Sequence, residues 1–213
     1  MWRSTSPEQV GAGRAPARGS LSPPPHPLLA HRTVSVRAGS VEFPMPGSEV
    51  KVVDGEGRTL PPGEPGELLV RGPYIMSDYL NKPDEDAVAF ANGWLRTGDV
   101  VVMTPDGYIT IVDRLKDLVL VSGFNVYPNE VEAVIAAHPD VVEVAVVGAP
   151  DETTGEAVCA YVVSRRPELT AAEVVQYCRT QLTAYKVPKR VIFRDQLPKS
   201  PVGKILRALL RAG

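Results

Sequence analysis

Residues 111–132, IVDRLKDLVLVSGFNVYPNEVE, decide how the chain is organised. The charged run Asp113–Asp117 is followed at once by Leu118–Val121, a short apolar segment typical of a buried strand. Pro128–His138 then has a proline at its start, a proline directly after it and apolar residues at helical spacing, namely Val131, Val134 and Ile135. The charged run therefore marks the boundary between a β-rich part and a mixed part.

Toward the C-terminus, strands and helices alternate. Strands are expected over the apolar segments Val141–Val147, Cys159–Val163 and Val191–Phe193. The run 170–173, TAAE, is a capping box that starts a helix, and Ile205–Leu210 predicts a last amphipathic helix. Residues 116–213 therefore predict a small mixed α/β domain, and the fold class of the chain is α+β.

Toward the N-terminus, short strands dominate. They are expected at Glu49–Val53, Glu67–Arg71, Val100–Met103 and Tyr108–Val112, separated by turn and proline-rich segments. One helical piece is expected near Asp84–Phe90. Residues 41–115 therefore predict a partial β-rich subdomain, a distorted antiparallel barrel.

Residues 1–40 have the composition of a leader without a core of its own. Proline, glycine, alanine, arginine and serine dominate, and the net charge is +4. Such a segment cannot bury enough apolar surface to offset its loss of conformational entropy, about 1–2 kcal/mol per residue for the backbone. We expect this leader to be disordered.

Composition and charge exclude several classes of protein. The 213 residues are 44% hydrophobic and 23% charged, and no apolar run approaches the roughly 18–20 residues of a membrane-spanning helix. Two cysteines without a CxxC motif and three histidines fit neither a disulfide scaffold nor a zinc ribbon. Residues 41–185 carry a net charge of −13 and residues 186–213 of +7. The basic tail either binds an anion or docks on the acidic body, and charge alone favours docking.

Asp99 ends the segment 93–99, GWLRTGD, ahead of an expected strand. An ionised aspartate has two acceptor oxygens and no donor, so a carboxylate held by a glycine turn suits the two hydroxyls of a diol such as ribose. The alternative is an aspartate that caps a turn. Arg114 suits a phosphate or a diol, or else forms a surface ion pair with Asp113 or Asp117.

Two other short runs are candidates for chemistry. Gly123, in the run 122–125, SGFN, allows a positive φ or the close approach of a ligand, or belongs to a plain turn. Lys204 ends the run 198–204, PKSPVGK, and we expect it to open the last helix. The helix dipole disfavours a lysine there unless an anion binds beside it, and the alternative is a solvated lysine.

Three segments together carry a family resemblance: 93–99, 111–132 and 182–207, LTAYKVPKRVIFRDQLPKSPVGKILR. With them the chain resembles the adenylate-forming superfamily of AMP-binding enzymes, and it is most similar to long-chain fatty acid–CoA ligases. The resemblance begins near Gly39. It implies that ATP and a fatty acid give an acyl-adenylate, after which the small C-terminal domain rotates and coenzyme A takes the acyl group.

The resemblance also assigns roles to residues of this sequence. It implies that Asp99 holds the ribose hydroxyls of AMP, that Arg114 assists it, and that Lys204 is the catalytic lysine that contacts the carboxylate and the α-phosphate. Lys116 takes the hinge position. Two residues, Gly123 and Phe124, belong to the loop that lines the path of coenzyme A.

One family feature is missing from the sequence. Neither GxxxxGK[ST] nor a TSGTTG-like phosphate loop occurs. The resemblance implies that this loop, the Mg²⁺ site and most of the acyl pocket belong to a larger N-terminal domain. We therefore expect the C-terminal portion of a long-chain fatty acid–CoA ligase, inactive alone, which uses ATP, coenzyme A and Mg²⁺ when complete.

Two other functions remain open: a ligase of aryl or medium-chain acids, and a non-catalytic module that binds a partner through an apolar face of 41–115. The sequence predicts a cytoplasmic protein without a nucleic-acid partner. It leaves open a peripheral contact with a membrane and a partner chain that supplies the N-terminal domain.

Overall fold

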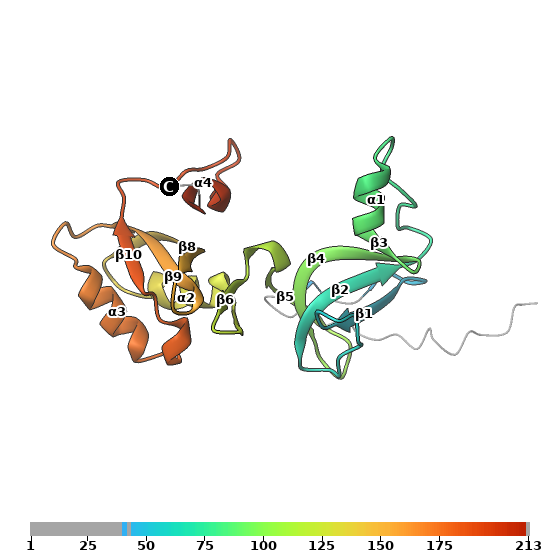
Figure 1. Cartoon of the computed structure of the whole chain (residues 1–213), viewed down its shortest axis with the longest axis horizontal. Coiled ribbons are helices and arrows are strands. Elements are labelled where there is room, and N and C mark those ends of the chain that lie inside the picture. The colour runs from blue at the N-terminus through green and yellow to red at the C-terminus, as the bar shows by residue number, and fades with distance from the viewer. Residues whose placement is uncertain (1–39, 42–43, 212–213) are drawn as a thin grey trace, which may run out of the picture. The chain divides into compact units, whose positions relative to one another are not determined.

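A computed structural model describes residues 40–41 and 44–211, so the leader expected over 1–40 lies, apart from Ser40, outside the described residues. The described part contains two five-stranded sheets (Figure 1). Both parts combine strands with a few short helices, and the predicted α+β class is confirmed. None of the described helices is long and apolar enough to cross a membrane.

The first sheet is antiparallel and curls into a half-barrel. Its strands are β1 (Glu49–Val53), β2 (Pro65–Arg71), β3 (Phe90–Ala91), β4 (Trp94–Met103) and β5 (Ile109–Arg114), and helix α1 (Pro83–Ala89) precedes β3. The strand order is β1-β2-β4-β3, and β5 also pairs with β4. Its core consists of Val52, Val101 and Ile109. The four predicted strands and the predicted helical piece all form.

The second sheet follows a short 3₁₀ turn, η1 (Leu115–Asp117). Its strands are β6 (Val119–Val121), β7 (Phe124–Val126), β8 (Val141–Asp151), β9 (Gly155–Ser164) and β10 (Arg190–Phe193). The order is β10-β9-β6-β7, with β8 on β9, and only β10 runs parallel to its neighbour β9. The helical segments are α2 (Pro128–Ala136), α3 (Ala171–Arg179), the 3₁₀ turn η2 (Ala184–Lys186) and α4 (Arg207–Arg211).

The second sheet is covered on both faces, which explains its continuous apolar strands. Because side chains alternate along a strand, Val144 and Val146 of β8 face one side and Ala145 and Val147 the other. The first side packs against residues of α2 and α3, including Ile135 and Val174. The second side packs against the C-terminal segment, through Leu197, Ile205 and Leu210.

Four elements differ from expectation. Strand β4 was expected from Val100 but begins at Trp94, so Asp99 lies inside the strand and not ahead of it. Strands β3 and β7 were not predicted, because runs of two or three residues show no measurable period. The last helix was expected from Ile205 but begins at Arg207. Ile205 is instead held in an isolated bridge to Lys199, which keeps this part of the backbone extended.

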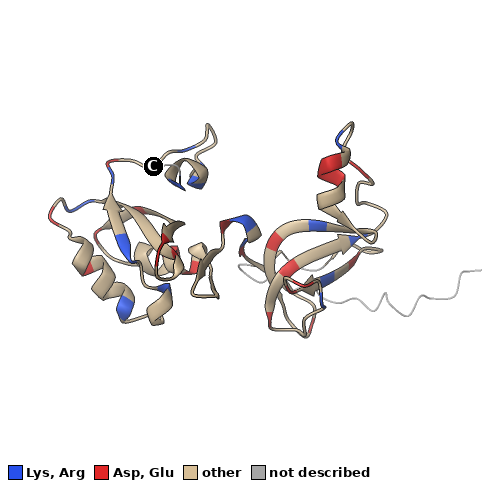
Figure 2. Cartoon of the chain, viewed as in Figure 1, with Lys and Arg blue, Asp and Glu red and all other residues tan. Residues whose placement is uncertain are grey.

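The basic tail docks on the acidic body, as the charge pattern favours. Figure 2 shows lysine and arginine positions along the C-terminal segment and acidic positions on the other strands and helices of the second part. Five tail cations form ion pairs with acidic residues of the body: Lys186–Glu130, Lys189–Asp151, Lys199–Glu143, Arg207–Glu132 and Arg211–Asp117. Within the described residues, Lys204 is exposed and forms no ion pair.

Gly66 allows close packing in the first sheet. A Cβ at this position would lie 2.4 Å from the Val53 carbonyl oxygen and 2.6 Å from Leu60 Cδ1. We expect Gly66→Ala to destabilise the 213-residue chain by about 1–3 kcal/mol, because the strands must separate to admit the methyl group. Urea unfolding measures this change. Gly55→Ala is the matched control, with nothing within 4 Å of its added Cβ, and an equal loss in both variants would contradict the packing argument.

Candidate functional site

A bulge in β4 presents the first candidate residue. The register of β2 and β4 shifts between Glu67 and Leu69, so that residues 97–99 of β4 lie opposite the single residue Leu68 of β2. Gly98 has a φ of 68°, a conformation that favours glycine. Thr97 holds the bulge closed, because its hydroxyl donates to the Leu68 carbonyl at 2.9 Å and accepts from the Asp99 backbone N–H at 3.1 Å.

Asp99 faces Arg114 across the sheet. The two residues are paired in the register of β4 and β5, and Asp99 Oδ1 lies 2.8 Å from Arg114 Nε. The Asp99 side chain is 17% exposed. Within the described residues, its buried Oδ1 has no hydrogen-bond partner, since the contact with Arg114 lacks hydrogen-bond geometry. The ion pair with Arg114 thus fixes the carboxylate, whose two oxygens are acceptors of the kind that suits the hydroxyl donors of a ligand.

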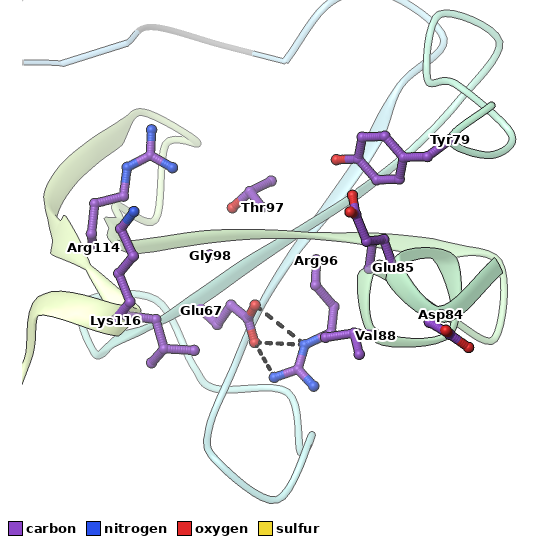
Figure 3. Close-up of a pocket in the computed structure, with 12 residues that line it drawn as sticks. Glu67, Tyr79, Asp84, Glu85, Val88, Arg96, Thr97, Gly98, Arg114 and Lys116 are labelled. Carbon is purple, nitrogen blue, oxygen red and sulfur yellow. Dashed lines mark hydrogen bonds and ion pairs between the residues drawn. The ribbon is translucent and has the colours of Figure 1, made fainter. Parts of the chain in front are cut away.

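Arg114 also belongs to the wall of a cavity of about 750 Å³ in the first part of the chain. Figure 3 shows Arg114 and Lys116 on one side of this cavity and Tyr79, Glu85 and Val88 on the other. Lys116 lies in η1, is exposed and lines the cavity directly after the last strand of the first sheet. The predicted hinge residue therefore lies at the connection between the two sheets.

Sequence reasoning missed the ion pair in the wall of this cavity. Glu67 is only 5% exposed, and its Oε2 accepts from Arg96 Nη2 at 2.6 Å and from Nε at 3.0 Å (Figure 3). Glu67 holds the Arg96 pKa above its usual value. The signal was present, because a period of two places Glu67 on the same buried face of β2 as Leu69.

Gly123 lies in the two-residue turn that joins β6 and β7. Ser122 and Gly123 both have positive φ, 50° and 85°, as a type I′ turn requires. Phe124 follows the turn, is 57% exposed and stacks on Tyr185 with ring centroids 4.9 Å apart. Of the alternatives at Gly123, the structure has a tight turn with a positive φ, and this turn presents an exposed aromatic ring.

Lys204 does not open the last helix, so that expectation was wrong. Its backbone closes a small hairpin, in which Ser200 N donates to the Lys204 carbonyl at 2.8 Å and Lys204 N to the Ser200 hydroxyl at 3.2 Å. Helix α4 begins three residues later and has only five residues, so its dipole gives no reason for an anion at Lys204. The structure thus presents the Lys204 ammonium as an exposed cation at the end of a hairpin.

The described chain thus brings Asp99 and Arg114 together, with Lys116 in the wall of the cavity that Arg114 also lines. Gly123 and Lys204 lie on two separate turns of the second part. Both cysteines are free and buried, and burial raises the Cys178 pKa to about 11, so this thiol is inert as a nucleophile.

Two family models match the chain. The model of the AMP-binding enzyme matches residues 27–80, and the model of the AMP-binding enzyme C-terminal domain matches residues 130–204. The chain belongs to the AMP-binding enzyme family. The first match starts inside the segment expected as a leader, ahead of Gly39 where the resemblance was seen to begin.

Curated relatives of this AMP-binding chain carry the name of one enzyme. The long-chain-fatty-acid–CoA ligase of Escherichia coli is 54% identical over 178 residues, which cover 84% of this chain and 32% of the relative. A Mycobacterium tuberculosis enzyme, long-chain-fatty-acid–CoA ligase FadD13, is 43% identical over 86% of this chain and 36% of its own length. The chain thus spans about a third of the length of these relatives.

A solved structure shares the fold of the described AMP-binding chain. The crystal structure of ATP-bound MatB from Rhodopseudomonas palustris matches with a TM-score of 0.77 and 39% identity, over 82% of this chain and 35% of that one. The bound ATP belongs to MatB.

Mg²⁺ is the cofactor that the family resemblance implies. In the part of the AMP-binding chain that the structure describes, no group of three or more histidine, cysteine, aspartate or glutamate residues is arranged to hold a metal ion. The described residues therefore offer no cluster that would hold Mg²⁺ by protein ligands alone, without the phosphates of a nucleotide.

Proposed function

We propose that this chain is the C-terminal portion of a long-chain fatty acid–CoA ligase. In the complete reaction, ATP and a fatty acid form an acyl-adenylate and diphosphate, and coenzyme A then takes the acyl group and releases AMP. The observation that carries the proposal is the carboxylate of Asp99, which a strand bulge presents and an ion pair with Arg114 holds in place. The identity of 54% to a ligase of this name supports it.

Asp99 binds the nucleotide in this proposal. Its carboxylate accepts hydrogen bonds from the two ribose hydroxyls, and a charged acceptor makes such bonds stronger than a neutral one. Arg114 holds the carboxylate in place through the ion pair at 2.8 Å. The bulge closed by Thr97 keeps the carboxylate in place before ATP binds.

Lys204 and Gly123 act at different stages. During adenylation, the Lys204 ammonium lies against the fatty acid carboxylate and the α-phosphate, where negative charge accumulates in the transition state. The second part of the chain then rotates about Lys116, and the turn with Gly123 and Phe124 lines the path of the thiol arm of coenzyme A. Coenzyme A, ATP and the acid are substrates, and a cytoplasmic location with a peripheral contact at a membrane completes the proposal.

A graft tests the proposed function. Residues 40–213 replace the matching third of the Escherichia coli ligase, and the graft is assayed with ATP, Mg²⁺, oleate and coenzyme A. We expect oleoyl-CoA formation. A folded graft that makes neither acyl-adenylate nor oleoyl-CoA would contradict the proposal. A graft that accepts only aryl or medium-chain acids would show that residues 40–213 determine the acid specificity and that the chain comes from a ligase of those acids.

The chain by itself is not expected to form acyl-adenylate. The sequence contains no glycine-rich loop to bind the β- and γ-phosphates, and such loops position the phosphates for transfer. Diphosphate release by the 213-residue chain with ATP, Mg²⁺ and oleate should equal the rate without protein. Release above that background, abolished by Asp99→Asn, would overturn the expectation.

A non-catalytic module is the second candidate. One observation favours it: several large apolar residues between 74 and 88 are exposed, namely Tyr74, Met76, Leu80 and Val88. An apolar group of this kind suits a contact with another protein part. The two candidates differ in the graft, because a module without catalytic residues gives no dependence of adenylation on Lys204.

A further inference from the structure

The hairpin that carries Lys204 has little apolar packing of its own. Val202 is 88% exposed, and Gly203 and Lys204 are exposed beside it. A hollow of about 410 Å³ lies between this hairpin and α2, lined in part by Glu132, Ala136 and Gly203. Apolar contacts therefore do not fix the direction in which Lys204 points.

Leu197 and Ile205 anchor the chain before and after the hairpin in the core, and ion pairs also hold both of its ends. Lys199 at its first end pairs with Glu143 of β8. Arg207, directly after its second end, is 20% exposed and donates to both carboxylate oxygens of Glu132, with Nη2 at 2.7 Å and Nε at 3.1 Å. The same Nη2 also donates to Asn129 Oδ1 at 2.7 Å. A two-point contact of this kind fixes the guanidinium in direction as well as in distance.

The acceptor of this contact is itself fixed. Glu132 is 18% exposed, and its Oε1 also accepts from the backbone N–H of Val146 in β8 at 2.7 Å. Arg207 therefore connects the hairpin to a carboxylate that is bound to the second sheet. Since α4 has only five residues, its own hydrogen bonds do not hold this end of the hairpin in place.

A second carboxylate links the same segment to the connection between the two sheets. Asp117, 11% exposed, accepts from Arg211 Nη2 at 2.6 Å and lies 3.5 Å from Arg207 Nη1. Asp117 follows Lys116 directly in η1. Both arginines of α4 thus contact the residue next to the proposed hinge.

We propose that Arg207 is a positioning residue for Lys204. Its contacts with Glu132 and Asp117 fix the hairpin over α2 and make Lys204 and the segment after Lys116 move as one body. The inference rests on the proposed role of Lys204 in adenylation. Arg207 itself touches no reacting atom in this account, so it acts only through the position of Lys204.

Hydrogen exchange in the 213-residue chain tests directly whether Arg207 holds the hairpin of Lys204 in place. In Arg207→Ala, the amides of residues 200–206 should exchange about tenfold faster, while those of β8 and β9 keep their rates. Arg207→Lys keeps the charge but loses the two-point contact and should give an intermediate rate. Arg166→Ala is the matched control, because it removes an arginine that pairs with two acids, Asp140 and Glu173, away from the hairpin. Unchanged exchange at 200–206 in Arg207→Ala would overturn the proposal.

A double-mutant cycle in the graft tests the consequence. Arg207→Ala should lower the rate constant of adenylation about tenfold or more at an unchanged KM for ATP, and it should leave thioester formation from preformed acyl-adenylate unchanged. Combined with Lys204→Ala, it should cause no further loss, because the two residues act as one unit. If the loss of the adenylation rate constant in the double variant equalled the product of the two single losses, the positioning role would be overturned.

The failure of this inference differs from the failure of the proposed function. If Lys204→Ala leaves adenylation unchanged, the proposed function fails, whereas the exchange result still decides whether Arg207 fixes the hairpin. If Lys204→Ala slows adenylation and Arg207→Ala does not, only the positioning inference is wrong.

Discussion

Lys204→Ala in the grafted ligase is expected to slow acyl-adenylate formation about a hundredfold or more. The ammonium is exposed, lacks an ion pair among the described residues and ends a hairpin held at both sides, so it is available to a ligand at a fixed place. A charged donor aimed at developing negative charge contributes about 2.7–4 kcal/mol to transition-state stability, which corresponds to a factor of about 10²–10³.

The two half-reactions separate this role from a general loss of structure. Diphosphate release in a quenched-flow experiment measures adenylation, and acyl transfer from preformed oleoyl-adenylate to coenzyme A measures the second step. Only the first should fall in Lys204→Ala, while Lys116→Pro should slow mainly the second by stiffening the hinge. Arg179→Ala, which removes an exposed cation from α3, is the control and should change neither. Equal losses of both steps in Lys204→Ala would contradict the role in adenylation.

Asp99→Asn in the same graft is expected to raise the KM for ATP about 10- to 150-fold. The change removes the charge that strengthens the hydrogen bonds to the ribose hydroxyls, worth about 1.5–3 kcal/mol for bonds to an ionised group. The asparagine also places an amide N–H₂ group, which is a donor, opposite either the Arg114 guanidinium or a ribose hydroxyl, and both of these are donors too.

Initial rates at varied ATP concentration measure this effect. Asp84→Asn is the matched control, because Asp84 lines the same cavity as Arg114, is exposed and loses the same charge. An unchanged KM in Asp99→Asn, or an equal rise in both variants, would show that Asp99 does not bind the nucleotide.

The fold was predictable where the pattern was long. Strands β8 and β9 have apolar runs of four residues (144–147) and seven residues (157–163), with both faces buried. The capping box of α3 forms as expected, with Thr170 and Glu173 bonded to each other's backbone. The short strands β3 and β7 were not predicted, although each pairs with the adjacent strand through a two-residue turn, Asn92-Gly93 or Ser122-Gly123, that is a local hairpin signal.

The candidate site was predictable in its residue types and less so in its geometry. Asp99 and Arg114 were both singled out, but their pairing depends on the register of β4 and β5, which no local pattern encodes. The expected helix start at Lys204 was wrong because the bridge between Lys199 and Ile205 extends the backbone there. The cluster around Asp117 and Arg207 joins residues 90 positions apart, so sequence spacing gives no sign of it.

The central claim is that the Asp99 carboxylate recognises the ribose of a nucleotide, and the chain itself offers a direct test. AMP is added to the ¹⁵N-labelled 213-residue chain up to about 10 mM, a range that detects millimolar affinity, and amide shifts are followed by NMR. We predict shifts at Gly98, Asp99 and Arg114 with AMP, and much smaller shifts with 2′,3′-dideoxyadenosine monophosphate, which lacks both hydroxyls. Equal shifts with the two nucleotides, or none at these three residues with AMP, would contradict the account.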